Sequence, residues 1–128
     1  MRNTPSVIFL LAASMLAGQA TLLAHHGNAA YDTTKEVTLT GVVTQWLVAN
    51  PHSVLRFDVT DDKGNLVHWI VESSAPSANQ ARIRLNKDSL KPGDKVTVTV
   101  IPAKNEQPVG RIHRLVLPDG RIVNTELP

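Results

Sequence analysis

The sequence contains no cysteine, and aromatic residues make up only 4% of its 128 residues. Without cysteine the chain can form no disulfide bond, no Cys-ligated zinc or iron–sulfur site and no thiol nucleophile. A bound metal would therefore need imidazole, carboxylate or terminal amine ligands. A chain of this length forms one domain at most.

A large surplus of charge of one sign is also missing. The chain has 13 Lys and Arg against 11 Asp and Glu, and its formal net charge is +2. After Arg2, the basic residues are spread along the chain from Lys35 to Arg121. Nucleic-acid-binding domains usually concentrate basic residues on one face and add exposed aromatic side chains. We therefore expect no nucleic-acid partner.

Residues 1–24 have the pattern of an export signal. Arg2 and the terminal amine form a short positive region, the residues from Val7 to Ala13 are all apolar, and small residues follow. The apolar stretch is interrupted from Ser14 onward and is shorter than the ~20 residues that a membrane-spanning helix needs. We expect a periplasmic or secreted protein with no membrane span after the signal is cleaved.

Two cleavage points fit the preference for small residues before the cut. Cleavage after Ala20 places Gly18 three positions before the cut, whereas cleavage after Ala24 places Leu22 there, which is less favoured. The second cut would make His25 the first residue of the mature chain. The sequence slightly favours the first cut, and both stay open at this point.

Apolar and polar residues alternate through most of the chain after Lys35, which is typical of half-buried strands. Gly41, inside the first alternating stretch, indicates a bulge or bend. Pro76 suits the first turn of a short helix over residues 78–85. Strands are expected at 37–44, 53–60, 66–72, 96–100 and 110–117, and residues 121–124 extend the last strand or return along it.

Five strands with a helix after the third follow the element order of an oligonucleotide/oligosaccharide-binding (OB) barrel. We expect an all-β fold: a small five-stranded OB-like antiparallel barrel with one short helix between the third and fourth strands, preceded by a signal peptide. A small antiparallel β-sandwich would fit the same order of strands and helix. The core should contain Trp46, Phe57 and Trp69. The expected divisions are a signal peptide at 1–24, an N-terminal extension at 25–36 and the barrel domain at 37–128.

The mature chain contains an ordered set of motifs: His25-His26-Gly27, Ala30-Tyr31-Asp32, Val37 to Val43, Asn50-Pro51-His52, Asp58-Val59 with the Gly64 turn, Trp69 with Glu72, Ser89 to Asp94, Pro102-Ala103-Lys104 and Leu117 to Arg121. This set resembles DUF6152, a family of small exported bacterial proteins of unknown function. The resemblance implies an export signal followed by a β-barrel, and it carries over no activity.

Three of the five histidines form the candidate metal site. If the mature chain begins at His25, its terminal amine and ring can chelate Cu(II), and His52 completes a set of nitrogen ligands, with His26 as a substitute for it. Nitrogen ligands of this kind suit copper or zinc. The alternative is that His25 and His26 lie in a disordered tail and that the His52 ring bonds a turn carbonyl.

The other two histidines are expected to be structural. His68 should be half-buried and hydrogen-bonded, and His113, between Arg111 and Arg114, should be solvated. Glu72 lies on the same strand face as His68, but the strand rise separates the two by ~13 Å, too far to share a metal.

No sequence pattern indicates catalysis. The chain has no Gly-x-Ser-x-Gly elbow, no phosphate-binding loop and no His-Glu-x-x-His pair. Asp61 and Asp62 adjoin, but in a polar turn where we expect no shifted pKa. We therefore expect an exported, non-enzymatic binding or accessory module that binds an unknown protein or a small cation. Its competitor is an interaction module of the cell envelope whose histidines are purely structural.

Overall fold

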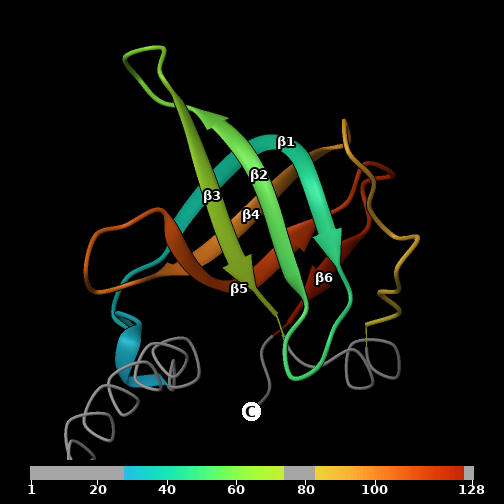
Figure 1. The fold of residues 1–128 in the computed structure, drawn as a ribbon, viewed down its shortest axis with the longest axis horizontal. Helices are drawn as coiled ribbons and strands as arrows, with labels where there is room; N and C mark the ends of the chain where they lie inside the picture. Colours follow the sequence, from blue (N-terminus) through green and yellow to red (C-terminus); the bar gives the residue numbers. More distant parts are fainter. Residues whose placement is uncertain (1–27, 74–82, 126–128) are drawn as a thin grey trace, which may run out of the picture.

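A computed structural model describes residues 28–73 and 83–125. After a short 3-10 turn, η1, the described chain is built from six strands (Figure 1). Five of these strands lie where alternation predicts them, and the sixth, β6, returns along the fifth. The elements are η1 (Asn28–Ala30), β1 (Val37–Leu47), β2 (Val54–Thr60), β3 (Leu66–Glu72), β4 (Lys95–Pro102), β5 (Val109–Val116) and β6 (Ile122–Asn124).

The strands form one sheet in the order β3-β2-β1-β4-β5-β6, which closes into a barrel where β3 also pairs with β5. The closing pair is parallel, with Ile70 opposite Val109 and Glu72 opposite Arg111. The expectation of an antiparallel barrel is therefore wrong at this pair. A closed ring of five strands cannot alternate in direction throughout, because an odd number of strands leaves two neighbours that run the same way. The fold is all-β, with a closed five-stranded mixed barrel.

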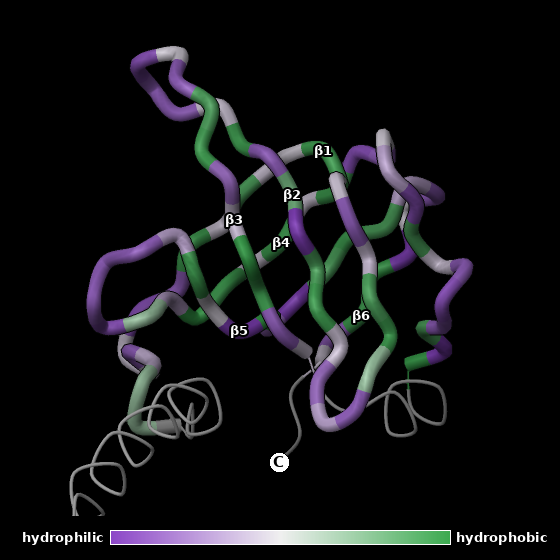
Figure 2. The backbone as a smooth tube through the Cα atoms, viewed as in Figure 1, coloured by the Kyte–Doolittle hydropathy of each residue, from purple (hydrophilic) through white to green (hydrophobic). Residues whose placement is uncertain are grey.

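Hydrophobic and hydrophilic residues alternate along the strands (Figure 2). The alternate apolar residues of the strands form the buried core of the barrel. Phe57 and Leu55 of β2 are fully buried, while Arg56 between them is exposed. Burying a side chain of this size stabilises the fold by about 1.5–3 kcal/mol. Trp46 and Trp69 are only partly buried and pack against this core. The predicted core is thus confirmed for Phe57, and the two tryptophans lie at its margin.

Two glycines allow the barrel to close tightly. A Cβ atom on Gly110 would lie 2.2 Å from Val100 Cγ1 and 2.6 Å from the Ile101 carbonyl oxygen, and one on Gly41 would lie 2.4 Å from the Asp58 carbonyl oxygen. The expected bulge at Gly41 is not found there, because the register of β1 against β2 shifts between Val43 and Gln45. Gly41 instead provides close backbone approach.

The helix expected over 78–85 is not confirmed. Residues 78–82 lie outside the described part of the chain, and Ile83 to Leu85 form a turn and irregular structure. The expected signal peptide at 1–24 also lies outside the described residues. Among the residues described, no helix is both long and apolar enough to cross a membrane.

The turn between β2 and β3 is held by the carboxylate of Asp61. Its Oδ1 accepts hydrogen bonds from the backbone N–H groups of Asn65 (2.8 Å) and Lys63 (2.9 Å). Hydrogen bonds from the Asn65 backbone and side chain lower the pKa of Asp61 below its ordinary value, because they stabilise the charged form. The expectation that this turn leaves its acids unshifted is therefore wrong for Asp61.

Candidate functional site

The segment before β1 is fastened to one end of the barrel by backbone hydrogen bonds. Asp32 N–H donates to the Pro102 carbonyl (2.9 Å), and Lys104 N–H donates to the Ala30 carbonyl (3.0 Å). Tyr31 forms an isolated antiparallel bridge with Ala103. The chain therefore enters the barrel along the end of β4 and the start of the β4–β5 loop.

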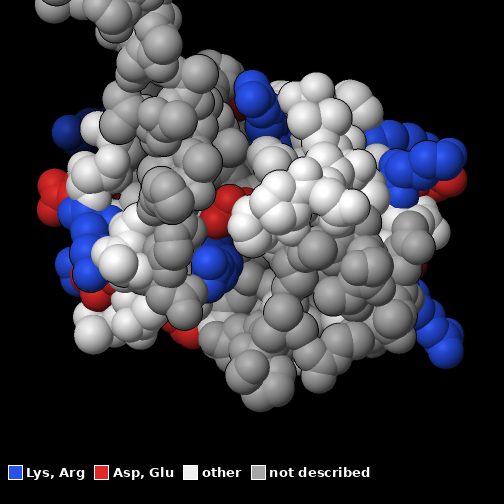
Figure 3. Space-filling model, turned by 60° about the horizontal axis from the view of Figure 1, so that its bottom comes forward, with Lys and Arg blue, Asp and Glu red and all other residues white. Residues whose placement is uncertain are grey.

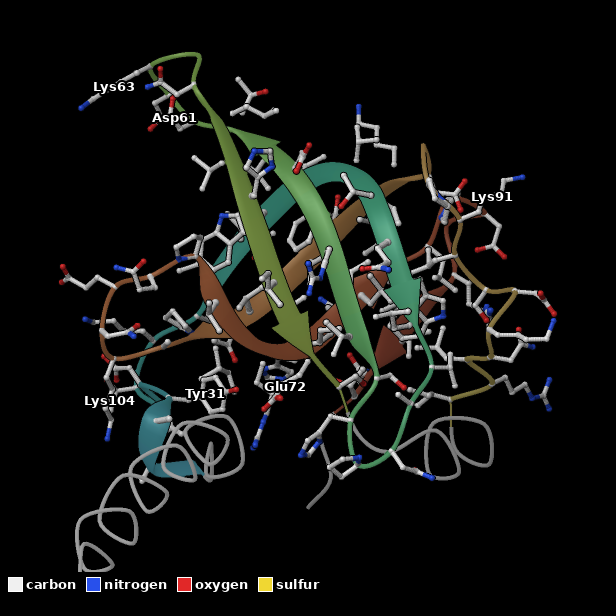
Figure 4. The ribbon with its side chains drawn as sticks, viewed as in Figure 1. Tyr31, Asp61, Lys63, Glu72, Lys91 and Lys104 are labelled. Atoms are coloured by element: carbon white, nitrogen blue, oxygen red, sulfur yellow. The ribbon has the colours of Figure 1, made fainter. Side chains whose placement is uncertain are left out.

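Tyr31 anchors this segment through its side chain as well (Figure 4). Its hydroxyl donates a 2.6 Å hydrogen bond to Glu72 Oε1, and the residue is only 4% exposed. Burial, followed by the hydrogen bond to Glu72, raises the pKa of Tyr31 well above its ordinary value. The phenol therefore stays protonated and serves as a hydrogen-bond donor. We call this contact the Tyr31–Glu72 latch.

Arg111 completes the latch from the neighbouring strand. The pairing of β3 with β5 sets Arg111 opposite Glu72, and its guanidinium lies over the Tyr31 ring, 5.0 Å from the ring centroid. A cation over an aromatic face is attracted by the ring's quadrupole. The latch thus joins the N-terminal segment to the two strands that close the barrel.

His52 lies at the same end of the barrel as the latch. Val54, which begins β2, pairs with Glu72, which ends β3, and His52 precedes Val54 by two residues. The His52 ring is exposed, and its Nδ1 lies 3.2 Å from the Ser73 carbonyl oxygen. Since a carbonyl can only accept, Nδ1 carries the proton, and in the neutral ring Nε2 has a lone pair. The ring thus bonds a backbone carbonyl as predicted, but the acceptor follows β3 and does not belong to the turn at Asn50-Pro51.

The structure does not test the rest of the predicted metal site. His25 and His26 lie outside the described residues. Within residues 28–73 and 83–125, no three His, Asp or Glu side chains are grouped so that they could hold a metal ion. His52 is therefore the one member of the predicted ligand set whose surroundings are known.

His68 differs from its expected environment. Its side chain is 75% exposed, on the outer face of β3, and its Nδ1 lies 2.6 Å from Asp58 Oδ1 on β2. The hydrogen bond is as expected, but the half-buried position is wrong. The inner positions of β3 belong to Val67, Trp69 and Val71, so His68 faces outward.

His113 also differs from expectation, because it is not simply solvated. Its side chain is 29% exposed and forms an ion-pair contact with Glu36, the residue before β1. β1 and β5 flank β4 on opposite sides, so this contact spans the width of β4. No local sequence pattern indicates this contact between Glu36 and His113.

The latch residues were not recognised as a unit in the sequence. Tyr31 and Glu72 both occur in the motifs quoted for the family resemblance, and Tyr31 is the only tyrosine of the sequence, followed by a polar stretch. Those two signals could have singled them out. Their contact, and the addition of Arg111, depends on the parallel β3–β5 pairing, which no local pattern reveals.

Charge on the described surface is mixed. On the face shown in Figure 3, Lys and Arg side chains are interspersed with Asp and Glu among uncharged residues. Arginine and lysine therefore form no continuous field of one sign among the described residues of this face.

Comparison with known proteins identifies a family. The model of a family of unknown function, DUF6152, matches residues 12–112. No curated protein and no solved structure matches the chain. Since the match covers well over half of the sequence, the chain belongs to the DUF6152 family.

Proposed function

We propose that the protein is an exported, non-enzymatic binding module that coordinates Cu(II) or Zn(II) through His25, His26 and His52. The observation that carries the proposal is the Tyr31–Glu72 latch, which holds the chain just after the two N-terminal histidines at the barrel end that bears His52. The proposal includes cleavage of the signal after Ala24 and a periplasmic or secreted location.

Covalent geometry limits how far the terminal ligands can lie from the latch. Tyr31 is the sixth residue after His25, and an extended chain spans at most about 3.3–3.6 Å per residue. His25 therefore lies within about 20 Å of Tyr31. Tethering of this kind raises the effective concentration of one ligand at the others.

The hydrogen bond of His52 is of the kind that metal-binding histidines form, as well as structural ones. Metal-binding histidines almost always donate the second ring nitrogen to a carbonyl or carboxylate, which fixes the ring and its tautomer. The bond from His52 Nδ1 to the Ser73 carbonyl has this form and presents Nε2 to an incoming metal. A terminal amine with imidazole nitrogens favours copper over zinc.

The barrel itself supports a binding role rather than an enzymatic one. The ring order β1-β2-β3-β5-β4 fits an OB-type barrel, in which the second and third strands and the adjoining loops bind ligands. His52 lies on the loop between β1 and β2. The mixed charge of the surface in Figure 3 fits a small cation or a protein as partner, not a nucleic acid.

Native mass spectrometry of the exported protein tests the proposal, because one spectrum reports both the first residue and the bound metal. We expect a chain that starts at His25 and carries one copper or zinc ion. His52→Ala should weaken metal binding, and His68→Ala, which removes another exposed histidine, should not. A chain that starts at Thr21, or one that stays metal-free after copper is added and the excess removed, contradicts the proposal.

A second candidate is an interaction module of the cell envelope whose histidines are structural. The bond of His52 to Ser73 favours it, since this contact joins the β1–β2 loop to the residue that follows β3 without any metal. In that case the paired substitution His25→Ala and His26→Ala leaves partner binding intact. Under the metal proposal the same pair abolishes stoichiometric metal uptake.

A further inference from the structure

Among the residues that the structure describes, the first half of β3 has a free edge. β3 pairs with β2 along its whole length, but its pairing with β5 covers only Ile70 to Glu72. In the part of the chain that the structure describes, no strand flanks the residues from Leu66 to Trp69 on the side away from β2. Figure 1 shows why: the β2–β3 hairpin projects beyond the barrel, past the place where β5 joins it.

The hydrogen bonds of the hairpin show which backbone groups face this edge. In an antiparallel pair, residues that exchange backbone bonds alternate with residues whose N–H and C=O groups point away. Asp61 N–H donates to the Asn65 carbonyl at the tip, and Ser73 N–H donates to the Ser53 carbonyl at the base, each at 2.8 Å. Every second residue from Asn65 or from Ser73 has the same orientation toward β2. Val67 is one of these residues, so its backbone N–H and C=O groups bond to β2.

The residues of the other parity turn their backbone groups outward. They are Leu66, His68 and Ile70, and Ile70 N–H donates to the Pro108 carbonyl on the far side of β3 from β2 (3.0 Å). Leu66 and His68 therefore direct two N–H donors and two C=O acceptors toward the free edge. These four groups define the β3 edge site.

The β3 edge site lacks the features that normally prevent strand pairing. Free edges are usually blunted by lysine, proline, a bulge or very short length. β3 has seven residues, contains neither Lys nor Pro, and pairs with β2 without a register shift. Apolar side chains flank the site, with Leu66 57% exposed and Ile70 39% exposed. By contrast, β6, the other edge strand, has only three residues.

We propose that the β3 edge site pairs with the same site of a second copy of this chain, forming a symmetric antiparallel dimer about Val67. Leu66 then lies opposite the partner's His68, and the two exchange both backbone hydrogen bonds. The symmetric contact doubles this to four bonds. Two copies therefore satisfy all four outward groups on each side, and twofold contacts of this kind are the commonest in soluble oligomers.

Side chains at the three paired positions fit this arrangement. Val67 faces the partner's Val67 in the close, non-hydrogen-bonded position, where β-branched pairs are favourable. No Lys, Arg, Asp or Glu stands at positions 66–68, and each His68 is already bonded to Asp58 of its own chain. Asn65 ends the hairpin turn and lies just before β3, so the interchain pairing stops before it reaches Ile70, whose N–H is already bonded to Pro108.

Light scattering and native mass spectrometry over a range of protein concentrations test the proposal, with Leu66→Pro as the disrupting variant. Leu66 is the first residue of β3 and its N–H faces the edge, a position where proline is tolerated. The substitution removes two of the four interchain bonds, so the dimer dissociation constant should rise about tenfold or more.

Ile122→Pro is the matched control. Ile122 is the first residue of β6 and is 54% exposed. Leu117 N–H donates to the Arg121 carbonyl, so the backbone groups of Arg121 point toward β5. The next residue, Ile122, therefore directs its N–H away from β5, toward the free edge of β6. This variant should dimerise like the unaltered protein. If it loses the dimer while Leu66→Pro keeps it, the β3 edge site is not the interface.

Hydrogen exchange gives a readout that needs no variant. As concentration rises, the amides of Leu66 and His68 should become protected, while the Val67 amide, already bonded to β2, changes little. A protein that stays monomeric at all concentrations, or a dimer in which Leu66 and His68 exchange as fast as in the monomer, overturns the proposal.

Discussion

The Tyr31 hydroxyl donates a hydrogen bond to Glu72, 41 residues later in the sequence, and this single 2.6 Å bond connects the N-terminal segment to the last residue of β3. Glu72 is also the residue that pairs with Arg111 where the barrel closes. The latch therefore connects two events that are separate in the sequence: docking of the N-terminal segment and closure of the sheet.

Tyr31→Phe should lower the free energy of unfolding by about 1.5–3 kcal/mol, the usual contribution of a hydrogen bond to a charged group. The ring and its packing under Arg111 remain, so only the hydroxyl is removed. Urea denaturation measures the change. Thr33→Val, which replaces an exposed residue of the same segment, is the control and should change the free energy of unfolding little. Equal stability of Tyr31→Phe and the unaltered protein would show that the latch contributes nothing.

The stability of the unaltered protein should fall relative to Tyr31→Phe as the pH rises above about 10. The pKa of Tyr31 is raised in the folded protein, so the unfolded chain loses the phenolic proton first. The contribution of this group is complete below the unfolded-state pKa and is lost as the pH rises through the folded-state value. Denaturation curves of both proteins at several alkaline pH values measure the effect, and parallel pH profiles would contradict it.

Gly110→Ala should destabilise the barrel by about 2 kcal/mol or more, because the added methyl group meets backbone as well as side chain. Gly110 pairs with Val71 in the closing strand pair, so the amide of Ile70 should lose its protection from hydrogen exchange. Gly64→Ala is the control: a Cβ there meets no atom within 4 Å, and only the positive φ of 84° opposes it. Protection of Ile70 should survive in that variant.

The strands were predictable because alternation is local. β2 and β3 begin and end within one residue of the predicted ranges, and Leu55 and Phe57 face inward as the period of two requires. The direction of the β3–β5 pair was not predicted. It depends on how many strands close the ring, a property that no single strand carries.

The environments of the histidines were less predictable for a related reason. A period of two places His68 on the face opposite Trp69, but it does not say which face is inside until the neighbouring strands are known. The ion-pair contact of His113 with Glu36 depends on β1, β4 and β5 lying side by side. For His52 the kind of bond was predictable but its partner was not, because the acceptor is the carbonyl of Ser73, just after β3, and not a carbonyl of the Asn50-Pro51 turn.

The β2–β3 turn should loosen in acid before the barrel unfolds. Hydrogen bonds from Asn65 and from the Lys63 backbone lower the pKa of Asp61, so this carboxylate contributes to stability above its unfolded-state pKa of about 3.9. The contribution is lost as the pH falls from there through the lower, folded-state value. In NMR spectra, the amide shifts of Lys63 and Asn65 should titrate together with the Asp61 carboxyl. Asp61→Asn, whose amide oxygen can still accept these bonds, should abolish the titration but keep the turn, and Asp61→Ala should lose both. If the two amides titrate in Asp61→Asn as well, another group controls the turn.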